Sequence, residues 1–162
     1  MGKRRMAREM AVQMLYQRDL GASQVPEVLH SFDVPDFLRE RVPQDESEAI
    51  AEASTGDQRE ARDAFEYARR LVEGTLDHLE AIDGLLRAQA DNWRLERMPA
   101  VDRNVLRLAV YEFMHELDVP KLVVIDEAVE LAKRFGSEQS GRFVNGLLDG
   151  LLRSHAFPGS LQ

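Results

Sequence analysis

The sequence contains no cysteine and no long apolar run. The missing cysteines exclude disulfide bonds, zinc and iron–sulfur sites built on cysteine, and a thiol nucleophile. No apolar stretch approaches the roughly 18 residues of a membrane-spanning helix. Arg8, Glu9 and Arg18 interrupt any signal-peptide core behind the basic N-terminus. We therefore expect a cytoplasmic protein that does not enter a membrane.

The sequence also lacks the motifs that would bring side chains together into a catalytic or metal-binding site. There is no glycine-rich phosphate loop and no Gly-x-Ser-x-Gly nucleophile turn. Glu127 and Glu130 lack the histidine three residues further on that a carboxylate-bridged metal site needs, and we expect ion pairs with Lys133 or Arg134 instead. No metal-ligand partner stands at helical spacing from His30, His78, His115 or His155. The sequence predicts no enzyme activity, no metal and no cofactor.

The charge of the chain is unevenly distributed. Hydrophobic residues make up 44% and charged residues 31% of the 162 residues, which suits one globular domain. The net charge is −8, which by itself does not favour nucleic acid. Residues 1–20, however, hold five basic and two acidic side chains, whereas residues 31–60 hold nine acidic and three basic ones. The sequence therefore indicates an acidic protein with a basic beginning.

Apolar residues recur at three- and four-residue spacing along most of the chain, with no alternating strand pattern. This pattern predicts an all-α bundle of about seven helices in a single domain over residues 1–162, with a flexible acidic insertion at about 40–58. The predicted helices are Lys3–Leu20 before Gly21, a short one at Pro26–Phe37, a long stretch from Arg59 with a break near Ile82–Gly84, a largely apolar one at Ala100–Leu117, one around Ile125 ending at Gly136, and a last one capped by Ser137.

The first predicted helix carries a candidate RNA-binding surface. On a helical wheel, Arg5, Arg8, Val12 and Tyr16 fall within an arc of roughly 80°. Guanidinium groups bind phosphate, and a tyrosine on the same surface can stack on an unpaired base. The alternative is structural, because a basic first turn is often only solvated and Tyr16 would then lie at the edge of the core.

Two further features have both a functional and a structural interpretation. Glu112 falls on an apolar helix face, where a carboxylate must find donors, either structurally or as a ligand. The segment Ser137–Gly146 offers a helix N-terminus, with Arg142 one turn in and Gly141 leaving open space. Its structural alternative is plain helix capping.

Four segments of the chain resemble the NusB family of bacterial transcription antitermination factors. They are RRMAREMAVQMLY (Arg4–Tyr16), NWRLERMPAVDRNVLRLAVYEF (Asn92–Phe113), DVPKLVVIDEAVELAKRFG (Asp118–Gly136) and SEQSGRFVNGLLDGLL (Ser137–Leu152). Residues Val34–Glu60 depart from the family pattern. The resemblance implies the NusB fold, in which the helices form two packed three-helix-like bundles.

The resemblance also implies a function and partners. A NusB protein would bind single-stranded, boxA-like RNA of nascent ribosomal RNA leaders together with a NusE-type small-subunit ribosomal protein. The pair would join the RNA polymerase elongation complex with other Nus factors and suppress termination. Two alternatives stay open: an RNA-binding accessory domain working with a separate RNA cytosine methyltransferase, and a protein-only helical adaptor. A homodimer in the free state is compatible with the sequence.

The resemblance assigns roles to individual residues. Those implied to contact RNA are Lys3, Arg4, Arg5, Arg8 and Tyr16 on the first helix and Gln139, Ser140, Arg142 and Phe143 at the start of the last. Those implied to contact the NusE-type partner are Asp102, Arg103 and Glu112. No catalytic residue is implied.

Overall fold

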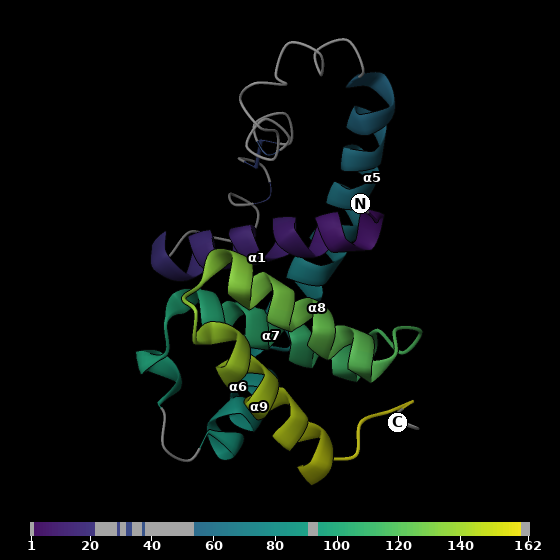
Figure 1. Cartoon of the computed structure of the whole chain (residues 1–162). Helices are drawn as coiled ribbons and strands as arrows, with labels where there is room; N and C mark the ends of the chain where they lie inside the picture. Colours follow the sequence, from purple (N-terminus) through teal and green to yellow (C-terminus); the bar gives the residue numbers. More distant parts are fainter. Residues whose placement is uncertain are drawn as a thin grey trace. The chain divides into compact units, whose positions relative to one another are not determined.

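All regular secondary structure in the described part of the chain is helical. The structure, a computed structural model, describes residues 2–21, 54–90 and 94–159 and the single residues 29, 32, 33 and 37. These residues form six α-helices and one 3-10 helix and contain no strand (Figure 1), which confirms the predicted fold class. None of these helices combines the length and the apolar character of a membrane-spanning segment. The chain divides into two compact units, Met1–Leu71 and Val72–Gln162.

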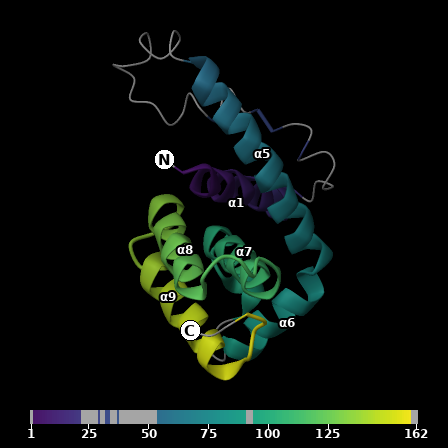
Figure 2. The same cartoon turned by 90° about the vertical axis from the view of Figure 1, so that its right-hand side faces the viewer.

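The first unit contains helix α1 (Lys3–Gly21) and most of helix α5 (Ser54–Asp77). The two helices cross (Figures 1 and 2). The predicted apolar face of α1 is buried in full and consists of Met6, Ala7, Met10, Ala11, Met14 and Leu15. The buried face of α5 in this unit is formed by Ala61, Ala64, Ala68 and Leu71 at three- and four-residue spacing. Small side chains on that face allow a neighbouring helix to approach closely.

Two sequence predictions fall largely on residues outside the described part. Of the short helix predicted at Pro26–Phe37, four residues are described; Phe32 among them stacks on Phe65, with ring centroids 5.7 Å apart, and also contacts Phe37. Of the acidic insertion predicted at about 40–58, residues 54–58 belong to α5, and the rest lies outside the described residues.

The break in the long helical stretch lies at His78, which ends α5 and precedes α6 (Leu79–Gln89). The break predicted near Ile82–Gly84 is therefore wrong. Ring atom Nδ1 of His78 lies 2.9 Å from the Gly74 carbonyl oxygen, and the His78 backbone N–H is shared between the carbonyls of Gly74 and Thr75. Because a side chain competes for the carbonyl that the helix ladder uses, the regular helix ends there, a local effect that hydrophobic spacing does not report.

The second unit is built around α7 (Ala100–His115), which the 3-10 helix η2 (Leu95–Arg97) precedes. Helix α8 (Lys121–Phe135) packs against both α7 and α9 (Ser140–Ser154), as Figures 1 and 2 show. Helix α7 is buried continuously from Asn104 to Phe113, as its apolar circumference predicted. The Lys121 ammonium donates a hydrogen bond of 2.8 Å to the Phe113 carbonyl near the end of α7, and burial lowers the pKa of this lysine.

His115, at the end of α7, gives the second unit a pH-dependent stability. Its ring centroid lies 4.1 Å from that of His78 and 5.3 Å from that of Tyr111. Burial lowers the pKa of His115 below 6.5, the neighbouring His78 lowers it further, and Glu116 acts in the opposite direction. The unfolded chain therefore binds this proton more readily than the folded one, so the stability due to neutral His115 is present above pH 6.5 and is lost at lower pH.

We expect the midpoint temperature of thermal unfolding, followed by circular dichroism, to decrease when the pH is lowered from about 7.5 to about 5. The decrease should be smaller in His115→Gln. The difference will be small, because the imidazole is exposed. His155→Gln removes a histidine away from this ring cluster and serves as the control. Parallel curves for the wild type and His115→Gln would contradict the prediction.

Candidate nucleic-acid interface

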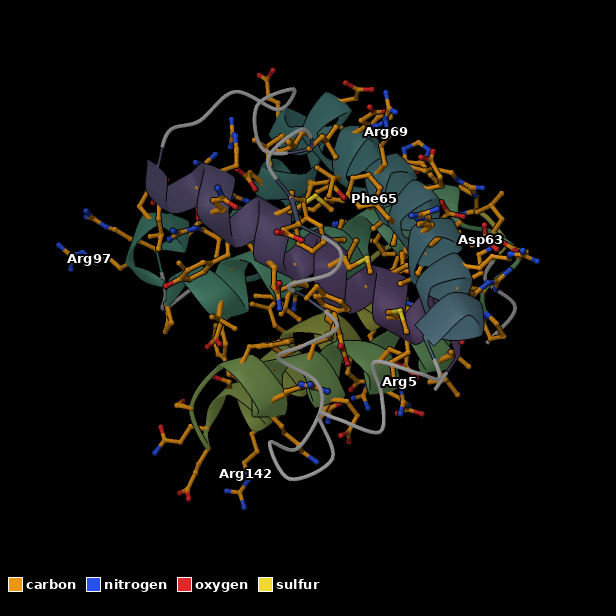
Figure 3. All side chains as sticks on the ribbon, turned by 90° about the horizontal axis from the view of Figure 1, so that it is seen from above. Arg5, Asp63, Phe65, Arg69, Arg97 and Arg142 are labelled. Atoms are coloured by element: carbon orange, nitrogen blue, oxygen red, sulfur yellow. The ribbon has the colours of Figure 1, made fainter. Side chains whose placement is uncertain are left out.

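The first turn of α1 presents three cationic side chains at the surface. Lys3, Arg4 and Arg5 are all exposed, and Figure 3 shows Arg5 near the beginning of the helix. The helix begins without an acidic residue in its first turn, so no carboxylate in that turn offsets the three charges. This turn forms the cationic part of the predicted RNA-binding surface.

Arg4 is oriented by an aromatic ring of helix α5. Its guanidinium carbon lies 5.8 Å from the centroid of the Tyr67 ring, and the guanidinium carbon of Arg70 lies 5.5 Å from the same centroid. Such cation–π contacts hold a guanidinium by the ring face and leave N–H edges for other acceptors. The sequence patterns did not single out Tyr67 or Arg70. Their spacing of three residues on one helix was visible, but the pairing with Arg4 depends on how α1 crosses α5.

Of the other residues in the predicted arc on α1, only some are exposed. Tyr16 is 38% exposed, whereas Arg8 is only 3% exposed and Val12 is buried. The reason is that α1 is buried all round from Met6 to Val12, with Glu9 included. Arg8 and Glu9 are both engaged with other groups, as buried charges must be. A helical wheel shows the direction in which a side chain points but not whether its helical turn is buried. It therefore placed Arg8 on the same surface as the exposed Arg5.

The residues at the start of α9 that were predicted to contact RNA are likewise partly exposed and partly buried. Gln139 and Arg142 are exposed, and Figure 3 shows Arg142 pointing away from the ribbon. Phe143 is half-buried, and Ser140 is only 1% exposed. Gln139, Arg142 and Phe143 are thus available at the surface of the second unit, whereas Lys3, Arg4, Arg5 and Tyr16 form a surface of the first.

Ser140 holds the turn between α8 and α9 together. Its hydroxyl oxygen accepts the backbone N–H of Ser137 at 3.0 Å, and the two hydroxyl oxygens lie 3.2 Å apart. A Cβ atom at Gly136 would come within 2.5 Å of the same hydroxyl oxygen, so the turn also needs that glycine. The predicted cap at Ser137 is wrong, because α9 begins at Ser140 with Gln139 at its N-cap position, and the side chain of Gln139 makes no capping hydrogen bond.

The residues predicted to bind a protein partner lie at the start and in the last turn of α7. Arg103 is half-buried, and its guanidinium donates to the carbonyls of Leu95 and Met98, each at 3.1 Å, which ties η2 to α7. Asp102 is 4% exposed, and its Oδ1 atom is buried with no hydrogen bond in the described part of the chain. Glu112 is 2% exposed, which agrees with the structural role left open for it.

A metal site is not formed by the described residues, which contain no group of three His, Asp or Glu side chains that could hold an ion. The described chemistry of the candidate site is therefore that of cations, amides and aromatic rings. Such groups bind phosphates and unpaired bases.

The comparisons with known proteins agree on one family. The NusB family model matches residues 5–153. Transcription antitermination protein NusB of Myxococcus xanthus is 43% identical over 149 residues, covering 92% of this chain and 94% of that protein. The protein of the same name from Sorangium cellulosum is 45% identical, covering 92% and 91%.

Solved structures with the same fold include NusB of T. maritima, with a TM-score of 0.67, 37% identity, and coverage of 96% of this chain and 94% of that one. They also include a chain of antitermination factors NusB and NusE in complex with dsRNA, with a TM-score of 0.70, 27% identity, and coverage of 96% and 99%. A family match over nearly the whole chain, relatives above 40% identity and a shared fold lead to one conclusion: this chain belongs to the NusB family.

Proposed function

We propose that this protein is an RNA-binding transcription antitermination factor. It binds boxA-type single-stranded RNA of nascent ribosomal RNA together with a NusE-type ribosomal protein, and the pair joins the elongating RNA polymerase with other Nus factors. The observation that carries the proposal is the match to proteins named for transcription antitermination over more than nine-tenths of this chain. One similar solved structure is that of antitermination factors NusB and NusE in complex with dsRNA. The protein acts by binding, without turnover, in the cytoplasm.

The exposed cations and rings supply the contacts to RNA. Lys3, Arg4 and Arg5 hold phosphates, and Tyr16 stacks on an unpaired base. In the second unit, Arg142 holds a phosphate, while Gln139 and the accessible part of Phe143 contact bases. The net charge of −8 repels RNA elsewhere and so directs it to these cations.

Buried members of the predicted set support the surface without touching RNA. Arg8 stabilises the enclosed part of α1, and Ser140 fixes the turn that presents Arg142. The NusE-type protein docks near the start of α7, where Arg103 is accessible in part and Asp102 lies beside it. Glu112 supports α7 from within.

A gel-shift titration with a labelled boxA-type RNA tests the proposal, with and without the NusE-type protein. We expect the wild-type protein to shift the RNA at low salt and the partner to raise the affinity. If three or four phosphates are contacted, log affinity falls with log salt at a slope of about −2 to −3. Absence of a shift at low salt in both arms would contradict the proposal. Methyl transfer from added S-adenosylmethionine would support a methyltransferase accessory role instead.

A further inference from the structure

The open space expected beside Gly141 is filled by a lysine from the preceding helix. A Cβ atom at Gly141 would lie 3.0 Å from Cγ and 3.3 Å from Cε of Lys133, and 3.6 Å from a methyl group of Val129. The aliphatic stem of Lys133, on the last turn of α8, therefore lies across the first turn of α9. It lies this close because residue 141 has no side chain.

The ammonium group of Lys133 is only weakly held at its own helix. Its Nζ atom lies 3.7 Å from Oε1 of Glu130, beyond hydrogen-bond distance, and both side chains are 60% exposed. In the described part of the chain, Glu130 is the one carboxylate within ion-pair distance of this ammonium. An exposed i,i+3 pair of this kind contributes little, so a stronger anion can take the place of Glu130 at small cost.

Arg142 follows Gly141 directly, so that two cations from different helices stand at one turn of α9. Arg142 is exposed and points away from the ribbon (Figure 3). Lysine supplies a compact point charge on a flexible stem, whereas arginine supplies a planar fork of donors, and phosphate oxygens accept from both. The packed stem of Lys133 reduces the conformational freedom that the side chain loses when it binds an anion.

We propose that Lys133 contacts a phosphate of the bound RNA beside Arg142, and that Gly141 is the positioning residue that lets Lys133 reach it. The inference rests on the proposed function and adds a residue of α8 to an RNA surface otherwise assigned to α1 and α9. Neither Lys133 nor Gly141 contacts a base in this proposal. Their contribution is therefore to RNA affinity and its salt dependence, not to sequence preference.

Lys133→Gln tests the contact, with Arg153→Gln as a matched control. Both changes neutralise one exposed cation paired with a carboxylate of its own helix, because Arg153 pairs with Asp149 at 3.1 Å on α9. We expect Lys133→Gln to weaken binding of boxA-type RNA about fivefold at about 0.1 M salt and to make the salt slope less negative by about 0.7, which is the share of one phosphate. Arg153→Gln should leave the slope unchanged.

Gly141→Ala tests positioning without any change in charge. The added Cβ requires the Lys133 stem to move by a few tenths of an ångström. We expect a smaller loss of RNA affinity than for Lys133→Gln, and no additional loss when Gly141→Ala is combined with Lys133→Gln. A merely structural effect would be the same in both backgrounds, so this double-mutant cycle separates the two roles.

The outcomes are distinct. Equal affinity and slope for Lys133→Gln and Arg153→Gln, in a protein that still binds RNA, would overturn the contact and leave the proposed function standing. An equal effect of Gly141→Ala in both backgrounds would overturn the positioning role. A wild-type protein that binds no RNA at low salt would overturn the proposed function and this inference with it.

Discussion

Replacing Arg4 and Arg5 together by alanine is expected to weaken the binding of boxA-type RNA about 25-fold at about 0.1 M salt. The salt slope should become less negative by about 1.4, the share of two phosphates on a single strand. Both side chains are exposed on the first turn of α1, and Arg4 is held against the ring of Tyr67, which orients its donors. Fluorescence anisotropy over a series of salt concentrations measures affinity and slope together.

A second pair of exposed arginines provides the control for net charge. Arg94 and Arg97 flank and end the 3-10 helix of the second unit, and Figure 3 shows Arg97 pointing away from the ribbon. The Arg94→Ala/Arg97→Ala protein loses the same two charges, and its slope should match the wild type. Alanine is a good helix former, so circular dichroism of the Arg4→Ala/Arg5→Ala protein should also match. Equal RNA affinity in the two double variants would contradict a specific site on α1.

The contrast between Arg5 and Arg8 shows what could be predicted from the sequence about the site. Periodicity correctly predicted that α1 is helical and which face is apolar, because both depend on neighbours three and four residues apart. It could not predict that the turn carrying Arg8 and Glu9 is enclosed, since that depends on segments distant in sequence. The pairing of Arg4 with Tyr67 had the same cause and was missed.

The fold was more predictable than the site, for a related reason. The all-α class and the enclosed character of α7 follow from the amount and spacing of apolar residues alone. The position of the break at His78 does not, because it depends on one ring nitrogen at the Gly74 carbonyl. The space at Gly141 was likewise expected to be open, since the sequence does not show that the stem of Lys133 crosses it.

The largest effect on stability is expected from Asp83→Ala. Asp83 on α6 accepts two hydrogen bonds from the Arg107 guanidinium on α7, at 2.9 and 3.0 Å, and both residues are buried. Removal of the carboxylate leaves a buried cation whose remaining acceptors include Asn104, at 3.3 Å, which carries no charge. The free energy of unfolding, measured by urea denaturation, should fall by about 3–5 kcal/mol.

The same helix provides a comparison that separates burial from distance. Arg87, one turn further along α6, pairs with Glu96 at 2.8 Å, but both side chains are more than half exposed. Arg87→Ala should therefore change the unfolding midpoint very little, although its ion pair is as short as that of Asp83. Replacing both buried partners, Asp83→Leu with Arg107→Met, should recover much of the stability lost in Asp83→Ala, since no uncompensated charge then stays inside. Similar losses for Asp83→Ala and Arg87→Ala would mean that the Arg107 cation reaches water when its partner is removed, and that α6 and α7 are held together by apolar packing instead.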